Sequence, residues 1–120
     1  MQLTACVTSE ESFTLVTLGG YIDLSTRKQL RDLLSTASKG VSHLVIDMSR
    51  LEFMDSTGLN VLIDLYRKLE ARGATLDLAA PRPIVAKVLE ISGLDKVFRV
   101  HTGLAQAMGG ASGQSAQPSS

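Results

Sequence analysis

The residues best placed to do chemistry in this chain are Asp55, Ser56 and Thr57, which set two hydroxyls beside a carboxylate. They stand where an apolar, strand-like run ends and a helical pattern begins. The first N–H groups of a helix lack intrahelical partners, and the helix dipole favours negative charge there. A phosphate on Ser56 would bring about 1.5 to 2 negative charges and three acceptor oxygens to this point. The helix end would stabilise that phosphate while Asp55 repels it, so we expect a switch that turns a binding surface off.

A simpler interpretation makes Ser56 the N-cap of the helix, Asp55 and Thr57 turn residues, and Gly58 a residue chosen for backbone freedom. Taken alone, the local sequence favours this interpretation, because such residues commonly precede an apolar helix. Two enzyme signatures do not fit. A nucleophile elbow needs glycine where Met54 stands, and an extra residue between Asp55 and Gly58 breaks the aspartic-protease pattern.

The elements that must position this corner alternate between strand and helix patterns along the chain. We expect a hairpin from residues 3–7 and 13–18, a bend at 19–20, a helix from near 26 to 37 capped by Ser25, a strand at 43–48, a helix at 59–69, a strand at 74–80, a helix at 84–92, and then a strand at 97–100 and a short helix at 103–108. Such alternation after an antiparallel start predicts an α/β fold with a mixed sheet. Residues 1–108 form the expected domain, and the Gly/Ser/Ala/Gln-rich residues 109–120 form an expected disordered tail.

Composition limits the function further. The 120 residues suit one domain, and 12 basic and 12 acidic residues give a net charge of zero without a basic cluster, which argues against direct nucleic-acid binding. Tryptophan is absent, so a base-stacking platform is not indicated. Cys6, the single cysteine, excludes an internal disulfide and a cysteine zinc site, and we expect it to be a small packed side chain. With no leader pattern and no apolar run near the roughly 20 residues of a membrane span, we expect a soluble, cytoplasmic protein.

Other candidate residues carry weaker signals. His43 and His101 are far apart in sequence and lie in no metal-binding motif, so we interpret them as surface or strand-end histidines. No phosphate-binding loop is present, and no cofactor or metal is indicated. Asp23 and Asp47 stand near the expected carboxyl ends of two strands, where open sheets present binding sites. For Asp47 we prefer a turn-capping role, and Asp23 could also help to cap the next helix.

Four segments together resemble the STAS domain family, in particular its single-domain bacterial anti-sigma factor antagonists. They are Gly20-Tyr21-Ile22-Asp23, Leu44-Val45-Ile46-Asp47, Phe53-Met54-Asp55-Ser56-Thr57-Gly58-Leu59 and Ile91-Ser92-Gly93-Leu94. The resemblance implies the STAS fold: a mixed four- to five-stranded sheet with an N-terminal hairpin and about four helices. Tyr21 departs from the family, many members of which have an acidic residue there.

The resemblance also implies a non-enzymatic function and partners. An unphosphorylated antagonist binds an anti-sigma factor that is also a serine kinase and so frees the sigma factor. The kinase then phosphorylates the serine that corresponds to Ser56, and a PP2C-type phosphatase reverses the step. By motif, Asp23 is carried over as a kinase-contact and positioning residue, and Thr57 is the second-choice acceptor. Together with Asp55, Gly58 and Leu59 these residues form the expected partner-binding site, on a chain expected to be a monomer or a weak homodimer.

Two other functions remain open. A STAS domain can act as an unphosphorylated scaffold or as a transporter-associated regulatory subunit, although the retained Asp55-Ser56-Thr57-Gly58 segment argues against this. An enzyme or nucleotide-binding module ranks last, because the sequence offers no general base, metal cluster or phosphate loop.

Overall fold

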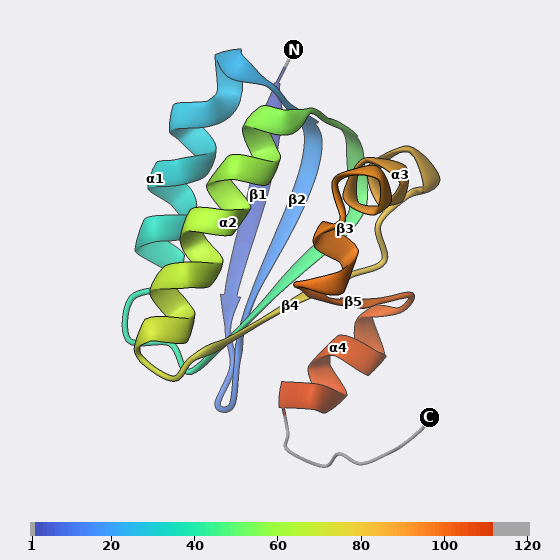
Figure 1. Cartoon of the computed structure of the whole chain (residues 1–120). Helices are drawn as coiled ribbons and strands as arrows, with labels where there is room; N and C mark the ends of the chain where they lie inside the picture. The colour runs from blue at the N-terminus through green and yellow to red at the C-terminus, as the bar shows by residue number, and fades with distance from the viewer. Residues whose placement is uncertain (1, 112–120) are drawn as a thin grey trace.

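The computed structural model describes residues 2–111, which form an α/β fold with one five-stranded sheet (Figure 1). The elements in chain order are β1 (Leu3–Ser9), β2 (Thr14–Ile22), a 3-10 turn η1 (Leu24–Thr26), α1 (Arg27–Ala37), β3 (His43–Met54), α2 (Ser56–Ala71), β4 (Thr75–Ala79), α3 (Pro83–Ser92), a 3-10 turn η2 (Leu94–Lys96), β5 (Arg99–His101) and α4 (Leu104–Ala111). The mixed sheet, the N-terminal hairpin and the four helices confirm the expected architecture.

The strands lie in their sequence order, from β1 at one edge to β5 at the other. β1 pairs antiparallel with β2, and every later pair is parallel. Helices α1, α2 and α3 pack on one face of the sheet around an aliphatic core, whose fully buried members include Leu18, Leu30, Leu62 and Leu78. Helix α4 packs on the opposite face against β3 and β4, where Ala107 meets Val45 and Ala79. Because β2 and β3 are parallel, their carboxyl ends lie side by side at the same end of the sheet.

Strand β3 is longer than its apolar run predicts. Residues 43–47 pair with β4, and beyond them β3 continues beside β2 alone as far as Met54. Asp47 therefore lies inside the strand and not near its end, and the expected turn-capping role at a strand end is wrong. The side chain is 8% exposed, and its Oδ1 accepts a hydrogen bond from Ser49 N at 3.0 Å.

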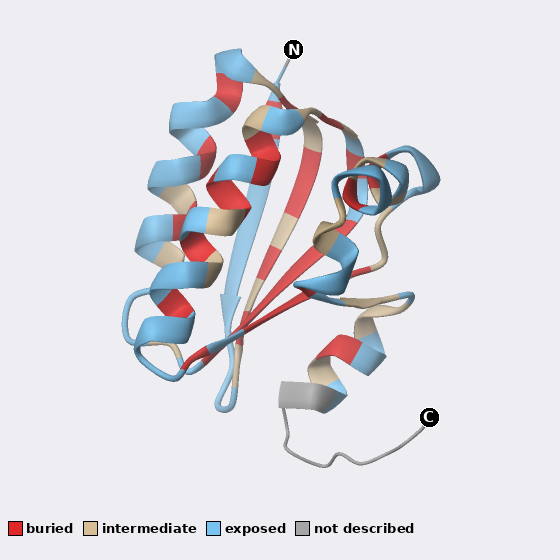
Figure 2. Cartoon of the chain, viewed as in Figure 1, coloured by how far each residue is buried: buried red, intermediate tan, exposed pale blue. Residues whose placement is uncertain are grey.

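The hairpin corrects one expectation and refines another. Cys6 is exposed and not packed, because β1 is an edge strand from which only Leu3 reaches the core (Figure 2). Gly19 and Gly20 bend β2 without ending it: the pairing register with β3 shifts on either side of them, and Gly20 has a φ of 86°. Those shifts bring the end of β2 level with the end of β3.

Helix α4, the last element of the described residues, is longer than expected. Residues 109–111, which the sequence analysis assigned to the tail, belong to α4, and the remainder of the expected tail lies outside the described residues. Within residues 2–111, no helix combines the length and the apolar character that crossing a membrane requires.

Candidate functional site

Ser56 occupies the first position of helix α2, immediately after β3. Asp55, and not Ser56, is the N-cap: its backbone is extended and its Oδ1 accepts a hydrogen bond from Thr57 N at 2.9 Å. The simpler interpretation of Ser56 as the cap is therefore wrong. Ser56 is exposed, and neither its hydroxyl nor its backbone N–H has a hydrogen-bond partner among residues 2–111. The sequence thus leaves a free hydroxyl and a free helix N–H at one solvent-facing residue.

The start of α2 is held tightly against the end of β2. Ile22 pairs with Met54, and Ile22 O accepts a hydrogen bond from Asp55 N at 3.3 Å. Gly58 makes the close approach of the helix possible, because a Cβ at this position would lie 2.6 Å from Met54 Cγ and 2.7 Å from Ile22 Cγ2. Gly58 is therefore required for packing space, which differs from the backbone freedom that the simpler interpretation gave it.

Asp23 directly follows Ile22, the last residue of β2, and so lies at the same carboxyl end of the parallel strands as Asp55. It caps the η1 turn: its Oδ1 accepts from Ser25 N at 2.9 Å and from Ser25 Oγ at 2.6 Å, while its own N–H donates to Thr26 Oγ1 at 3.0 Å. The hydrogen bond from the Ser25 hydroxyl is the main reason why the pKa of Asp23 lies below its ordinary value. Asp23, and not Ser25, is thus the cap, and α1 itself begins at Arg27.

The other expected site residues divide into two groups. Thr57 is half-buried, whereas Gly58 and Leu59 face the core, with Leu59 only 8% exposed.

Leu24, which the sequence analysis did not single out, is 77% exposed in the turn after Asp23. A leucine in a turn that follows a strand carries no signal by itself, so only its exposure reveals it. The exposed residues of this corner are therefore Leu24, Ser25 and Ser56, and Asp23, Asp55 and Thr57 are half-buried.

A buried ionic cluster on the opposite face of the sheet was also missed. His43 Nε2 lies 2.8 Å from Asp77 Oδ2, and Arg99 Nε lies 2.5 Å from Asp77 Oδ1. His101 Nε2 lies 3.7 Å from the same Oδ1. His43 and His101 are strand-end residues as expected, but His43 is buried, and both approach one fully buried carboxylate.

The charges around Asp77 decide its protonation state. Burial raises the pKa of the Asp77 carboxyl, but the hydrogen bond with His43 and the charges of Arg99, His43 and His101 outweigh burial and hold that pKa below its ordinary value of 3.8. Among residues 2–111, no group of histidine, cysteine and carboxylate side chains could hold a metal ion. Because its members come from β3, β4 and β5, we assign this cluster to the stability of the pairing between these strands.

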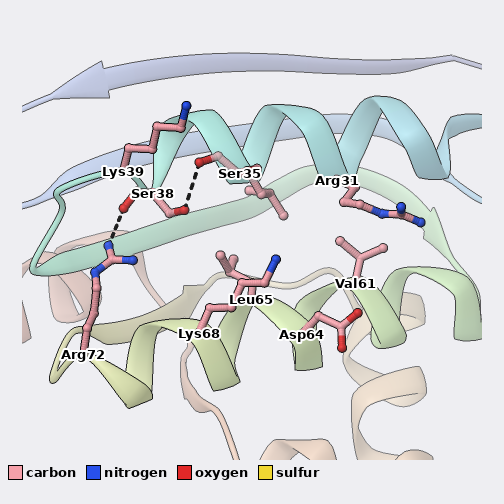
Figure 3. Close-up of a pocket in the computed structure, with 10 residues that line it drawn as sticks. Arg31, Ser35, Ser38, Lys39, Val61, Asp64, Leu65, Lys68 and Arg72 are labelled. Carbon is pink, nitrogen blue, oxygen red and sulfur yellow. Dashed lines mark hydrogen bonds between the residues drawn. The ribbon is translucent and has the colours of Figure 1, made fainter.

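A groove of about 230 Å³ runs between α1 and α2 (Figure 3). Its apolar floor includes Leu34 and Leu65, and its basic rim includes Arg31 and Lys68. Arg72 is already engaged, because its guanidinium donates to the carbonyls of Ser38 and Val41 at the end of α1. Lys68 lies in the last turn of α2, where the helix dipole favours a basic side chain.

Comparison with known proteins identifies this arrangement. The sequence profile of the STAS domain matches residues 5–107, and the chain belongs to the STAS domain family. The anti-sigma-F factor antagonist RsfB of Mycobacterium tuberculosis is 29% identical over 112 residues, which cover 92% of this chain and 91% of RsfB. The observed sheet and helices are thus the STAS fold that the sequence led us to expect.

Solved structures agree with this assignment. An anti-sigma factor antagonist from Mycobacterium paratuberculosis superposes with a TM-score of 0.85 at 28% identity, over 92% of this chain and 95% of that one. The anti-sigma factor antagonist SpoIIAA in its unphosphorylated form gives a TM-score of 0.80 at 27% identity, over 94% of this chain and all of that one. Bacillus SpoIIAA in its phosphorylated form gives 0.68 at 27% identity, over 88% and 96% of the two chains. RsfB and the first two of these structures are named as anti-sigma factor antagonists, and phosphorylated SpoIIAA is named as a cell fate determinant.

Proposed function

We propose that this protein is an anti-sigma factor antagonist controlled by phosphorylation of Ser56. In its unphosphorylated form it binds an anti-sigma factor that is also a serine kinase, and the sigma factor is released. Phosphorylation of Ser56 by that kinase ends the interaction, and a PP2C-type phosphatase restores the binding form. The observation that carries the proposal is the exposed, unpartnered Ser56 hydroxyl at the first position of α2.

The acceptor hydroxyl is accessible to a kinase without unfolding. Asp55 caps the helix through Thr57 N, so the Ser56 hydroxyl makes no bond that phosphorylation would break. The free N–H of Ser56 and the positive end of the helix dipole favour a phosphate at this position. Thr57 is half-buried and is a poorer acceptor, which supports the preference for Ser56. A folded antagonist can therefore carry the modification.

The same corner supplies the partner-binding surface in this proposal. Leu24, at 77% exposure, offers an apolar contact to a partner. The carboxylates of Asp23 and Asp55, at the starts of η1 and α2, belong to the same corner. A phosphate on Ser56 would add about 1.5 to 2 negative charges beside those carboxylates, and docking would have to desolvate them. Each 1.4 kcal/mol of lost binding free energy weakens affinity about tenfold. The existence of SpoIIAA in both phosphorylated and unphosphorylated forms supports a switch of this kind.

The proposal is tested with purified candidate anti-sigma factors that carry a kinase domain, taken from the organism that encodes this chain. Ser56→Ala is expected to bind its partner and to remain bound when ATP is added, because no phosphate can form at this position. Ser56→Asp is expected to bind at least about tenfold more weakly than the wild type. Equal affinity of Ser56→Asp and the wild type for the cognate kinase would overturn the electrostatic switch.

A further inference from the structure

Among the strands of residues 2–111, β1 lies at one edge of the sheet and has a neighbouring strand on one side only (Figure 2). Residues 4–9 are all exposed, and none of them is charged or proline. Soluble proteins usually protect such an edge with charged residues, prolines or bulges, because unpaired backbone groups accept a further strand. Within residues 2–111, α1 protects only one end of the edge, where Gln29 Nε2 donates to Leu3 O at 2.9 Å.

The pairing of β1 with β2 defines which backbone groups are free. Glu10 N donates to Phe13 O, and Tyr21 N donates to Gln2 O, both at 2.8 Å. In an antiparallel ladder these bonds recur at every second residue, so Thr4, Cys6 and Thr8 direct their N–H and C=O groups towards β2. The backbone groups of Ala5 and Val7, between those residues, therefore point outwards from the sheet.

We propose that a second copy of this chain pairs antiparallel with β1, on a two-fold axis that passes beside Cys6. In the segment Thr4-Ala5-Cys6-Val7-Thr8, an apolar residue and then a threonine follow Cys6 in both directions. In this register Ala5 faces Val7 of the other copy, and the two residues exchange backbone hydrogen bonds through their outward groups. Thr4 faces Thr8 of the other copy, a favourable cross-strand pair, and the two copies of Cys6 face each other. The two sheets become one continuous sheet.

Side-chain contacts and charges favour a copy of this chain over an unrelated strand. Val7 is 43% exposed and would be covered by Ala5 of the other copy. The acidic turn at Glu10 and Glu11 would lie near the Leu3 end of the other strand. Gln29 contacts that end, and the exposed Arg27 precedes it on α1, whereas Lys28 is already paired with Asp32 at 2.7 Å. The interface therefore brings unlike charges together at both of its ends.

Cys6 gives a direct test, because it is the only cysteine. The two copies of Cys6 would form a non-hydrogen-bonded pair with Cα atoms about 4.5 Å apart, within the range of a disulfide. The full-length reduced protein is treated with diamide, which takes up the two thiol hydrogens and their electrons as the S–S bond forms. We expect a covalent dimer, together with a concentration-dependent monomer–dimer equilibrium of the reduced protein in sedimentation. A reduced protein that stays monomeric at all accessible concentrations would overturn the proposal.

A matched pair of variants separates this register from random collision. In a Cys6→Ala background, Thr4→Cys and Thr8→Cys are expected to cross-link at least about tenfold faster when mixed than when either is alone, since positions 4 and 8 face each other only between copies. Equal rates for the mixture and the separate proteins would refute the register.

A second pair of variants tests the edge itself. Val7→Pro removes an outward N–H that β2 does not use, and Val7→Lys places a charge on the edge. Both are expected to abolish the dimer while circular dichroism and the unfolding midpoint of Val7→Lys stay as in the wild type. Dimers that persist in Val7→Lys would place the interface elsewhere. Ser56 follows β3, on the far side of β2 from this edge, so the result is independent of the phosphorylation proposal.

Discussion

The backbone N–H of Asp55 donates to Ile22 O over 3.3 Å and so joins the residue that caps helix α2 to the last residue of strand β2. Because Asp23 follows Ile22 and Ser56 follows Asp55, this single bond ties together the two segments of the candidate site. The site is thus built at one corner, where two parallel strands end side by side.

Asp55 and Ser56 are expected to differ sharply in their effect on stability although they are neighbours. Asp55→Ala removes the N-cap acceptor of Thr57 N and should lower the free energy of unfolding by about 1 kcal/mol. Ser56→Ala removes an exposed hydroxyl without a partner among the described residues and should change that free energy by less than about 0.5 kcal/mol. Urea unfolding of both variants checks the pair, and a larger loss for Ser56→Ala would show that its hydroxyl is structural.

Gly58→Ala should destabilise the start of α2. The added Cβ would lie 2.6 Å from Met54 Cγ and 2.7 Å from Ile22 Cγ2, and neither atom is the end of a flexible side chain. Overpacking of this kind costs about 1 to 3 kcal/mol. Asn60→Ala, at an exposed position of the same helix, is the matched control and should not lower the unfolding midpoint. A Gly58→Ala protein as stable as the control would mean that the corner relaxes freely.

Asp23 is expected to act through the geometry of its turn. Asp23→Ala loses the acceptor of both Ser25 bonds and should slow phosphorylation of Ser56, because the turn beside the acceptor is no longer held. Asp23→Asn keeps an acceptor oxygen and should restore most of the rate, since asparagine caps as well as aspartate. The rate is measured by phosphate incorporation with the cognate kinase. An Asn variant as slow as the Ala variant would instead assign the role to the charge of Asp23.

The Asp77 cluster predicts a defined pH dependence of stability. Because the pKa of Asp77 is lower in the folded protein than its ordinary value of 3.8, its contribution is complete above that value and is lost as the pH falls through the folded pKa. Asp77→Asn should therefore lower the free energy of unfolding by about 2 to 3 kcal/mol at pH 7 and by progressively less in acid.

Denaturant unfolding across pH 2 to 7 measures this difference. Asp64→Asn is the control, because Asp64 is exposed and has no ion pair within residues 2–111. A constant difference between the wild type and Asp77→Asn down to pH 2 would contradict the assigned ionisation.

The parts of the fold that depend on local pattern could be predicted from the sequence. The helical spacing from Leu59 to Leu69 and the stop at Ser92 and Gly93 both correspond to observed helices. The length of β3 could not be predicted, because beyond Met48 the strand has β2 but not β4 beside it, and exposed residues such as Ser49 and Arg50 interrupt the apolar run.

Features that depend on contacts between distant segments were missed. Asp77 lies in the strand expected at 74–80, and its partners His43 and Arg99 come from two other strands that are distant in sequence. The exposure of Cys6 follows from the edge position of β1, which an apolar run does not reveal. The sequence pattern identified the corner at Ser56. Only the backbone conformation and the hydrogen bond of Asp55 show that Asp55 caps the helix and that the Ser56 hydroxyl stays free among the described residues.

The most direct test of the account is intact-mass and fragment mass spectrometry of the protein purified from its native cells, with the wild type compared with Ser56→Ala. Partner switching predicts one phosphate in the wild type, assigned to Ser56 by its fragments and abolished in Ser56→Ala. Absence of phosphate on Ser56 under every growth and stress condition, with the phosphatase inhibited, would contradict the account and favour an unphosphorylated scaffold.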